Sequence, residues 1–255
     1  MEAGQVFNMK TIGLIPTRLN STRLPQKALL PINGLPLVIH TYRRCKLAKE
    51  LDEVIICCDD MKILKIAQKF KAKAILTSKN HQNGTERIYE GYINQKKKYD
   101  LIVDIQGDEP LISPHHINQV VSFHKKNISS DIILPNLKVP YSNNSNIVKL
   151  IFNKKKEVLY LTRGNVPFQF KKNINYIYKH LSIISFLPGS LELFAKSNKS
   201  KLEEIEDVEL LRAIDIGLKI KTVSFKGDSF SVDVEEDYEK AKIKILQDKY
   251  YSLYK

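Results

Sequence analysis

Three cations lie within ten residues of one another in the polar loop that follows the first apolar run of the chain, residues 12–15. Arg18 and Arg23 carry guanidinium groups, which can grip phosphate oxygens in pairs, and Lys27 adds an ammonium that acts as a point charge. Ligands of open α/β sheets bind beyond the carboxyl ends of strands, and residues 12–15 have the composition of a buried strand. The pattern therefore predicts a polyphosphate site, with a solvated basic loop as the alternative.

Neither of the common glycine motifs for phosphate binding occurs in the sequence. The Gly-x-x-x-x-Gly-Lys-Ser/Thr and Gly-x-Gly-x-x-Gly patterns are both missing. A nucleotide bound by this loop would therefore be held mostly by side chains.

A second polar loop, residues 77–87, leads into a helix that is predicted to begin near Thr85. Arg87 would lie in the first turn of that helix, where free backbone amides attract anions. Gln82 and Asn83 carry side-chain amides that can read the edge of a nucleobase through paired hydrogen bonds. A second phosphate or base site is one interpretation, and a capping loop with Thr85 as the N-cap is the other.

A carboxylate, Asp108, follows the apolar run 100–105 within a Gln-Gly-Asp-Glu-Pro stretch. A carboxylate directly after a buried strand, beside a glycine that lets backbone approach closely, is a common way to hold a divalent cation that bridges phosphates. Helix capping explains Asp108 less well, because Ser113 and Pro114 already supply an N-cap and a first helical residue. We therefore predict a metal ligand at Asp108.

These side chains need elements that carry them to one place. Strand-like runs alternate with helical patterns four times up to about residue 125, which predicts a parallel sheet with helices on both faces. Strands then follow one another with little helix between them, so we expect mixed or antiparallel strands to extend the sheet. The expected strands are 12–15, 28–32, 53–57, 73–76, 100–105, 132–139, 147–153, 158–162, 179–186 and 219–225. Helices are expected over 61–70, 114–124, 188–195 and 202–213, and onward from about 35, 85 and 235.

The length of 255 residues allows one sizeable core, so we expect a single domain over residues 9–255, with residues 1–8 as an N-terminal extension. No apolar run approaches the roughly 18 residues that a membrane span needs. The N-terminus lacks the basic and apolar segments of a secretory signal, so a cytoplasmic protein is expected. Three cysteines without a Cys-x-x-Cys pair argue against a disulfide framework or a cysteine zinc site.

The formal net charge of +13 raises the question of a nucleic-acid partner. Scattered lysines produce this charge, with short runs at 96–98 and 154–156, and no basic helix interleaved with aromatic residues accompanies them. We therefore expect no nucleic-acid partner, although a non-catalytic nucleotide- or RNA-binding protein stays as an alternative to an enzyme. An anionic substrate would benefit from the same positive field.

Taken together, the motifs of the chain resemble those of the cytidylyltransferases that activate 3-deoxy-D-manno-octulosonate (Kdo), the CMP-Kdo synthetases. The resemblance spans about residues 11–245 in seven ordered blocks. The blocks are Ile15-Pro16-Thr17-Arg18 with Ser21-Thr22-Arg23-Leu24-Pro25-Gln26-Lys27; His81-Gln82-Asn83-Gly84-Thr85-Glu86-Arg87; Gln106-Gly107-Asp108-Glu109-Pro110; Asn146-Ile147-Val148-Lys149; Arg163 with Pro167; Lys179-His180-Leu181; and Val232-Asp233 with Glu236-Asp237.

This resemblance implies a Rossmann-like nucleotidyltransferase fold of the α/β class, with a mixed, mostly parallel sheet flanked by helices and an added β-rich region for the sugar and for dimerisation. It implies a cytoplasmic homodimer that joins CTP to an acidic 2-keto sugar for lipopolysaccharide synthesis, with Mg²⁺ as the cofactor. The anomeric hydroxyl of the sugar attacks the α-phosphorus of CTP and pyrophosphate leaves. Catalysis is then mainly alignment and charge neutralisation, without a covalent protein nucleophile.

The resemblance also implies roles for individual residues. The triphosphate would be held by Arg18, Arg23 and Lys27, with help from Ser21. Magnesium would be bound by Asp108 and Asp233, and the nucleotide and the sugar would be faced by Gln106 and Arg87. The sugar would also be faced by Arg163, His180 and Glu209.

The sugar half departs from the family pattern in two places. After His180 and Leu181 the family continues Gly-Ile-Tyr, but this chain has Ser-Ile-Ile with Ile184 at the tyrosine position, which loses a phenol hydroxyl. Leu210 stands where the family has Gln, which removes two donors and an acceptor. Sites that hydrogen-bond a hydroxyl discriminate strongly, so the alternative to Kdo is an amino-Kdo or another 2-keto sugar acid.

Overall fold

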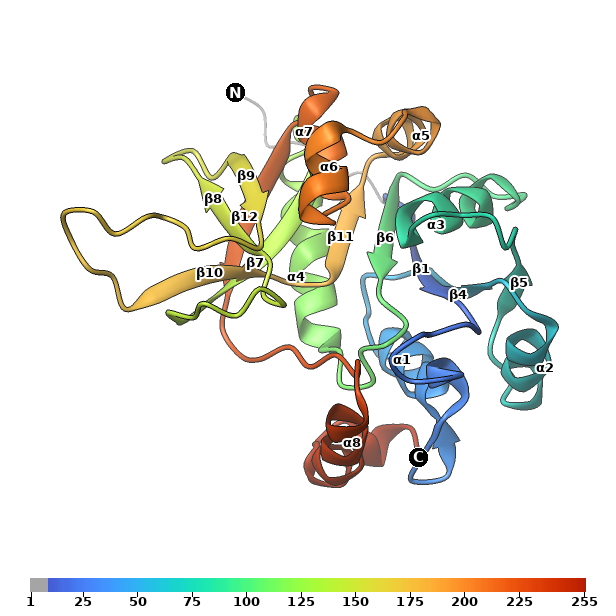
Figure 1. The fold of residues 1–255 in the computed structure, drawn as a ribbon. Coiled ribbons are helices and arrows are strands. Elements are labelled where there is room, and N and C mark those ends of the chain that lie inside the picture. Colours follow the sequence, from blue (N-terminus) through green and yellow to red (C-terminus); the bar gives the residue numbers. More distant parts are fainter. Residues whose placement is uncertain (1–8) are drawn as a thin grey trace.

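The computed structural model of the chain describes residues 9–255, so the expected extension, residues 1–8, lies outside the described part. One ten-stranded sheet runs through this part in the order β5-β4-β1-β6-β11-β7-β10-β8-β9, with β12 beside β7. Figure 1 shows helices packed along the sheet and a strand-rich lobe that ends in a long projecting loop. The predicted mixed sheet flanked by helices is confirmed.

The N-terminal half of the chain contributes the parallel part of the sheet. Its elements are β1 (Thr11–Thr17), η1 (Lys27–Leu29), β2 (Pro31–Ile32), β3 (Leu35–Pro36), α1 (Leu37–Lys46), β4 (Glu53–Cys58), α2 (Met61–Lys69), β5 (Ala74–Leu76), α3 (Gly84–Ile93), β6 (Leu101–Ile105) and α4 (Pro114–Lys125). β1 is central, because it pairs in parallel with both β4 and β6, and β4 pairs with β5. β1 and β6 are buried throughout, as the near-continuous apolar strands of a parallel sheet are.

The expected strand over 28–32 is only partly extended. Residues Lys27–Leu29 form a 3₁₀ turn, in which the amide of Leu29 bonds to the carbonyl of Gln26 at 2.8 Å. Since this turn satisfies its backbone locally, only Pro31–Ile32 pairs as a strand, with Leu35–Pro36.

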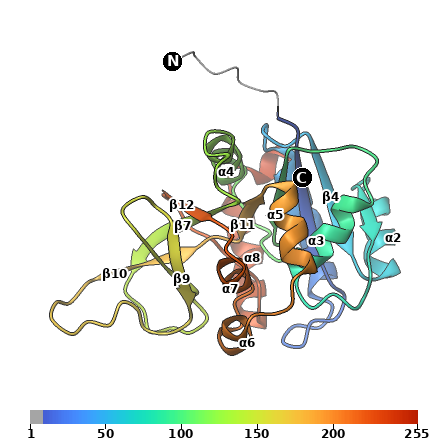
Figure 2. The same cartoon turned by 90° about the horizontal axis from the view of Figure 1, so that it is seen from above.

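The C-terminal half extends the sheet with mixed strands, as expected. Its elements are β7 (Ile132–Pro140), β8 (Lys149–Phe152), β9 (Val158–Thr162), β10 (Tyr176–His180), β11 (Ile183–Phe186), α5 (Pro188–Lys196), α6 (Lys201–Glu206), α7 (Leu210–Asp215), β12 (Ile220–Phe225), α8 (Glu235–Gln247) and η2 (Tyr251–Leu253). β7 organises this half, because it is antiparallel to β10 and β11 and parallel to β12. β9 and β10 form a lobe that stands away from α2 and α3 in both views (Figures 1 and 2).

Two apolar cores cover the opposite faces of the sheet. Val38 of α1, Ile63 of α2 and Val120 of α4 are fully buried in one core. Ile88 of α3 and Phe194 of α5 are fully buried in the other. Because helices occupy both faces, the ends of the strands are where polar side chains can gather around a ligand.

Two of the expected elements are interrupted in the structure. The single strand expected over 179–186 divides into β10 and β11, because β10 pairs with β7 and β8 whereas β11 pairs with β6 and β7. The single helix expected over 202–213 ends at Glu206, where Asp207 takes a left-handed φ of 51°, and α7 starts at Leu210. The second break places Glu209 at the start of a helix instead of in the middle of one.

Candidate active site

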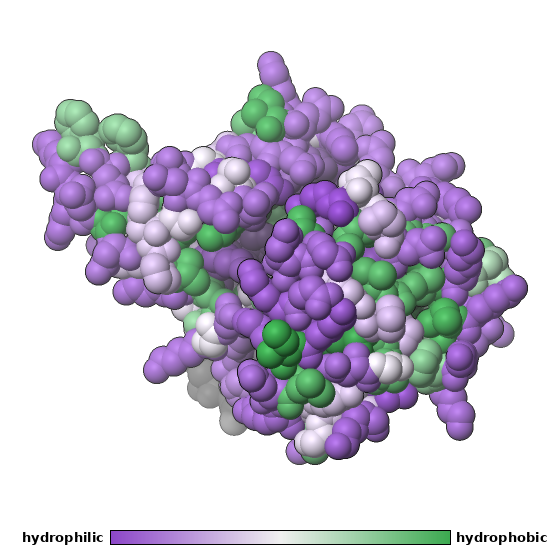
Figure 3. Space-filling view, turned by 60° about the horizontal axis from the view of Figure 1, so that its bottom comes forward, coloured by the Kyte–Doolittle hydropathy of each residue, from purple (hydrophilic) through white to green (hydrophobic). Residues whose placement is uncertain are grey.

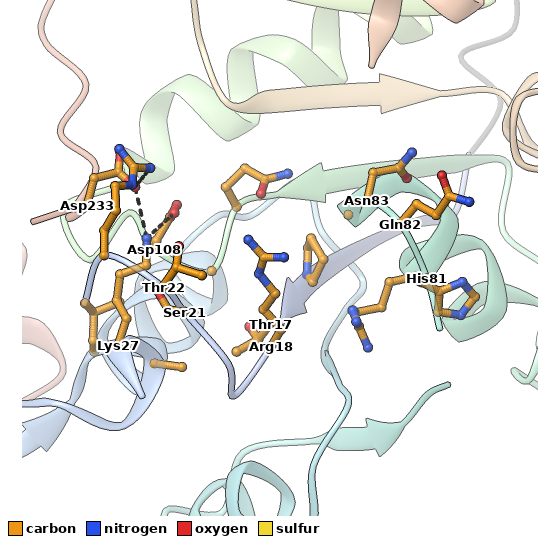
Figure 4. Close-up of a pocket in the computed structure, with 18 residues that line it drawn as sticks. Thr17, Arg18, Ser21, Thr22, Lys27, His81, Gln82, Asn83, Asp108 and Asp233 are labelled. Atoms are coloured by element: carbon orange, nitrogen blue, oxygen red, sulfur yellow. Dashed lines mark hydrogen bonds and ion pairs between the residues drawn. The ribbon is translucent and has the colours of Figure 1, made fainter. Parts of the chain in front are cut away.

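Polar side chains from four segments gather at the carboxyl ends of β1 and β6. The loop after β1, the start of α3, the loop after β6 and the segment before α8 line a cavity of about 350 Å³ (Figure 4). The structure brings all the predicted nucleotide-side residues to this cavity: Arg18, Ser21, Arg23, Lys27, Gln82, Arg87, Gln106, Asp108 and Asp233. The convergence follows from the parallel pairing of β1 with β6, whose carboxyl ends meet at one edge of the sheet.

Lys27 lies between two carboxylates in this cavity. Its Nζ is 2.8 Å from Oδ2 of Asp108 and 3.1 Å from Oδ1 of Asp233. Arg23 donates from Nη2 to the same oxygen of Asp233 at 3.0 Å. The side chain of Lys27 is 14% exposed, so water screens its ion pairs only in part. These contacts tie the loop after β1 to the segments that follow β6 and precede α8 (Figure 4).

Asp108 and Asp233 together have the chemistry of a partial magnesium site. They face one cationic atom from two segments, and carboxylate oxygens are ligands that Mg²⁺ prefers. Across residues 9–255, no group of three or more acidic, histidine or cysteine side chains is placed to hold a metal ion. Proteins commonly bind Mg²⁺ with one or two carboxylates while substrate phosphates and water complete the shell. The residues present fit an ion that binds together with a triphosphate.

Gly107 allows the loop after β6 to lie directly against the end of β1. A Cβ atom at this position would be 2.4 Å from Oγ1 of Thr17 and 2.8 Å from the carbonyl oxygen of Pro16. The carbonyl of Gly107 accepts a hydrogen bond from Thr41 at 3.2 Å. The close backbone approach that the sequence predicted is therefore present, and it holds Asp108 beside the end of β1 and the loop that follows it.

The loop before α3 begins its helix differently from the sequence prediction. Asn83 is the N-cap in place of Thr85: its Oδ1 accepts from the amide of Glu86 at 2.8 Å, and its Nδ2 donates to Oε1 of Glu86 at 3.1 Å. Because both ends of the Asn83 amide are engaged by the helix start, Gln82 is the side-chain amide that remains for a base.

Arg87 is almost wholly buried beneath the nucleotide-side cavity. Its Nη1 donates to Oγ1 of Thr77 at 2.8 Å and to the carbonyl of Ser78 at 3.0 Å. Its Nη2 lies 3.6 Å from Asp59, which in turn accepts from the amide of Leu19 at 2.8 Å. Through Asp59, Arg87 thus helps to hold the loop after β1 in place.

A second cavity, also of about 350 Å³, adjoins the first. The residues that line both cavities are Gln82, Asn83, Gly84 and Gln106. The three residues that the resemblance assigns to the sugar, Arg163, His180 and Glu209, all line the second cavity. Ile184 and Leu210, where the chain departs from the family, line it too, and they are 4% and 2% exposed.

Arg163 anchors one wall of the second cavity. Its Nε donates to the carbonyl of Glu206 at 3.0 Å, its Nη2 to the carbonyl of Asp207 at 3.1 Å, and its Nη1 to the carbonyl of Ser145 at 3.2 Å. These bonds satisfy the free carbonyls at the end of α6. Since a guanidinium has five N–H groups, Arg163 keeps donors for a ligand while it holds the wall.

His180 is neutral in this structure at neutral pH. Burial lowers the pKa of His180 to about 4. Its Nδ1 is 3.2 Å from the carbonyl of Leu181, which makes Nδ1 the protonated nitrogen and leaves Nε2 as an acceptor. A ring in this state pairs with a hydroxyl better than with a carboxylate.

Asp104 contacts a residue that lines both cavities, Gln106, although the sequence did not point to it. It is fully buried at the end of β6, and Gln106 donates from Nε2 to its two oxygens at 3.2 and 3.3 Å. Thr85 donates to Oε1 of Glu209 at 3.0 Å, and Oε2 of Glu209 is buried without a hydrogen-bond partner in the described residues. Burial first, and then the charge of Glu209, raise the pKa of Asp104; burial raises the pKa of Glu209 to about 7. The one signal in the sequence was a single acid inside an apolar strand.

Comparison with known sequences finds relatives along most of the chain. A cytidylyltransferase family model matches residues 12–220. A 3-deoxy-manno-octulosonate cytidylyltransferase from Thermodesulfovibrio yellowstonii is 39% identical over 250 residues, which cover 91% of this chain and 97% of that protein. An 8-amino-3,8-dideoxy-manno-octulosonate cytidylyltransferase from Shewanella frigidimarina is 34% identical over 246 residues, which cover 94% of this chain and all of that protein.

A solved structure shows the same arrangement of elements. CMP:2-keto-3-deoxy-manno-octonic acid synthetase complexed with CTP superposes with a TM-score of 0.87 at 28% identity, over 93% of this chain and 99% of that one. The predicted Rossmann-like nucleotidyltransferase fold is confirmed. The family match, the relatives and the shared fold together show that this chain belongs to the cytidylyltransferase family.

Proposed function

We propose that this enzyme transfers CMP from CTP to the anomeric hydroxyl of Kdo and releases pyrophosphate, for lipopolysaccharide synthesis. The observation that carries the proposal is the pair of adjoining cavities, one rich in cations and one lined by sugar-side residues, with Gln82 and Gln106 in the wall of both. A nucleotide and a sugar bound in the two cavities would meet at that shared wall. Relatives named for Kdo and for its 8-amino analogue match almost the whole chain.

The nucleotide-side residues would bind and orient the triphosphate. Arg18, Arg23 and Lys27 supply positive charge to its oxygens, and Ser21 adds a hydroxyl. Asp108 and Asp233 would hold Mg²⁺, which when bound would neutralise charge that develops on the phosphates. The sugar oxygen forms a bond to the α-phosphorus while the bond from the α-phosphorus to the bridging oxygen of pyrophosphate breaks. The proton of the hydroxyl is released to water, and the negative charge leaves with pyrophosphate.

The sugar-side residues would hold the acceptor in line for this attack. The free donors of Arg163 suit the sugar carboxylate, whereas the neutral ring of His180 suits a hydroxyl. Gln106 donates its amide nitrogen to Asp104, so its carbonyl oxygen remains to accept from a hydroxyl where the cavities meet. Glu209 would accept from another hydroxyl through the oxygen that lacks a partner.

We further propose that residues 9–255 act as a single cytidylyltransferase domain of a cytoplasmic homodimer. The continuous sheet supports the single domain. Phe168 and Phe170 are 83% and 81% exposed in the loop between β9 and β10, and Figure 3 shows hydrophobic side chains at the tip of this projection. Contiguous exposed apolar patches mark interaction surfaces. Light scattering should give twice the mass of the chain, and a variant with both residues changed to Ser should move toward the monomer.

None of the helices described for residues 9–255 is long and apolar enough to cross a membrane.

The proposal is tested by pyrophosphate release from CTP and Mg²⁺ with separate acceptors: Kdo, 8-amino-3,8-dideoxy-Kdo and a 2-keto sugar acid of another length. We expect turnover that requires both CTP and Kdo. Efficient turnover of the amino sugar with little of Kdo would move the acceptor to the amino analogue. Tight CTP binding without turnover of any acceptor would support a non-catalytic nucleotide-binding protein instead.

A further inference from the structure

One buried guanidinium joins the helices of the sugar side to the loop of the nucleotide side. Arg212 of α7 is 1% exposed, and its Nε and Nη2 donate to the two carboxylate oxygens of Glu203, both at 2.7 Å. Glu203 belongs to α6 and lines the second cavity. The guanidinium also lies 4.6 Å from the ring centroid of Phe194 in α5. This end of Arg212 secures the sugar-side wall.

The remaining arm of Arg212 reaches the other side of the site. Its Nη1 donates to Oε1 of Glu86 at 3.1 Å. Glu86 lies in the first turn of α3, where its Oε1 also accepts from Nδ2 of Asn83 and its Oε2 accepts from the amide of Gln82, each at 3.1 Å. One carboxylate thus orients two of the residues that line both cavities, Gln82 and Asn83. On the side of α3, Arg212 contacts Glu86, which lines neither cavity. Arg212 therefore reaches Gln82 and Asn83 only through Glu86.

Burial makes this connection stiff. The side chains of Arg212, Glu203 and Glu86 are 1%, 5% and 17% exposed, so the charges interact with little screening by water. A second bond runs beside it, from Thr85 of α3 to Glu209 at the start of α7, at 3.0 Å. A shift of α7 therefore has to move the start of α3, or break two buried contacts.

Arg212 can hold α6 and α7 together without its contact with Glu86. The bidentate pair with Glu203 already joins these two helices. If Arg212 had only that structural task, loss of the Glu86 contact would leave nucleotide binding unchanged. If the contact sets the loop, the loss has to appear in the affinity for CTP.

We propose that Arg212 is a positioning residue which, through Glu86, sets Gln82 and Asn83 against the nucleotide, and so links CTP binding to the sugar-side wall. The inference deepens the proposed cytidylyltransfer and rests on it for the identity of the nucleotide. A residue on a sugar-side helix would then control the affinity of the enzyme for CTP.

The test uses Glu86→Gln, Arg212→Lys and the double variant of the full chain. In Glu86→Gln an amide faces the guanidinium in place of a carboxylate, while the Glu203 pair is kept. In Arg212→Lys the charge is kept, but one ammonium cannot reproduce a fork that contacts two carboxylates. Titration calorimetry with CTP in the absence of sugar gives the affinity, and steady-state assays give kcat and the KM of each substrate. Glu192→Gln is the matched control, since this carboxylate on α5 is exposed and pairs with Lys196.

We expect roughly tenfold weaker CTP binding in each single variant, from the loss of a hydrogen bond between charged groups. The KM for CTP should rise by a similar factor, with kcat and the KM of the sugar within about threefold. The double variant should be no weaker than the single variants, because both changes break one connection.

Unchanged CTP affinity in folded Glu86→Gln would overturn the inference, as would losses that multiply in the double variant. If Arg212→Lys fails to fold, unchanged CTP affinity in Glu86→Gln still overturns the inference. The turnover of the wild-type enzyme is measured separately, so a failed inference leaves the proposed reaction standing. A wild-type enzyme without turnover would remove the reaction but not the calorimetric result.

Discussion

Nζ of Lys27 lies 2.8 Å from Oδ2 of Asp108, although 81 positions separate the two residues along the chain. Parallel pairing of β1 with β6 brings their following loops to one edge of the sheet, which is why the two side chains can meet. The same ammonium reaches Asp233 from a distance of 206 positions. One cation therefore holds together the segments to which we assign the phosphates and the magnesium.

The two carboxylates give the first prediction. Asp108→Asn and Asp233→Asn keep the shape of each side chain but remove a charge that Mg²⁺ requires, so we expect pyrophosphate release to fall by roughly 100-fold or more. Chelation with EDTA should stop the wild-type reaction, and added Mg²⁺ should restore it. Asp228→Asn, which changes an exposed carboxylate outside the cavity, is the control. Near wild-type rates in both site variants would remove these residues from the metal site.

The burial of the phosphate-side cations predicts unequal effects of their removal. The side chain of Lys27 is 14% exposed and that of Arg23 is 59% exposed. Charges screened less by water interact more strongly, so Lys27→Met should raise the KM for CTP more than Arg23→Met does. Steady-state kinetics are measured at low salt and at 0.5 M salt. The increase in the KM for CTP caused by Arg23→Met should fall with salt more than the increase caused by Lys27→Met. Lys65→Met on the exposed face of α2 should leave both constants unchanged, and equal effects of the two site variants would argue against the ranking.

The close packing of Gly107 predicts a steric effect without any change of charge. A methyl group there would meet Thr17 at 2.4 Å and the backbone of Pro16 at 2.8 Å, so the loop that carries Asp108 has to move. We expect Gly107→Ala to lower kcat/KM by about 10- to 100-fold, since small misplacements at a reacting centre are costly. Gly189→Ala, with open space around the added methyl, should behave as wild type. A fully active Gly107→Ala would show that Asp108 tolerates displacement.

The buried carboxyl of Glu209 predicts how stability depends on pH. Its pKa is raised from 4.5 to about 7 by burial, so the folded protein holds a proton that the unfolded chain releases above about pH 4.5. The contribution of Glu209 to stability is therefore full below about pH 4.5 and is lost as pH rises toward 7. Gln cannot ionise, so Glu209→Gln does not lose this contribution as pH rises, whereas the wild type does. The melting temperature of the variant minus that of the wild type should therefore increase from pH 4.5 to 7 and then level off. Differential scanning fluorimetry across this range measures the difference, and a flat difference would contradict the raised pKa.

Patterns within short stretches were enough to predict the strand-helix alternation and the loops that carry the nucleotide-side residues. Such patterns are local, because burial on a sheet and turn chemistry depend on near neighbours in the chain. The position of Arg18 after one strand and Asp108 after another also implied one shared edge, since the carboxyl ends of parallel strands meet. Three expected elements differ in the structure. The strand 28–32 begins as a 3₁₀ turn, the strand 179–186 breaks where the chain changes strand partner, and the helix 202–213 breaks where Asp207 takes a left-handed backbone.

By itself, the sequence determined the α/β class, the cation-rich loop after β1, the carboxylate after β6 and the resemblance to cytidylyltransferases. Only the tertiary structure decided that Asn83 caps α3, that Asp104 is buried against Gln106, and that Arg212 meets Glu86 across 126 positions. These facts depend on which side chains face one another after folding, and the pKa of Glu209 depends on its burial. The side-chain contacts and the pKa cannot be read from the neighbours of a residue along the chain, because they arise between segments that are far apart in the sequence.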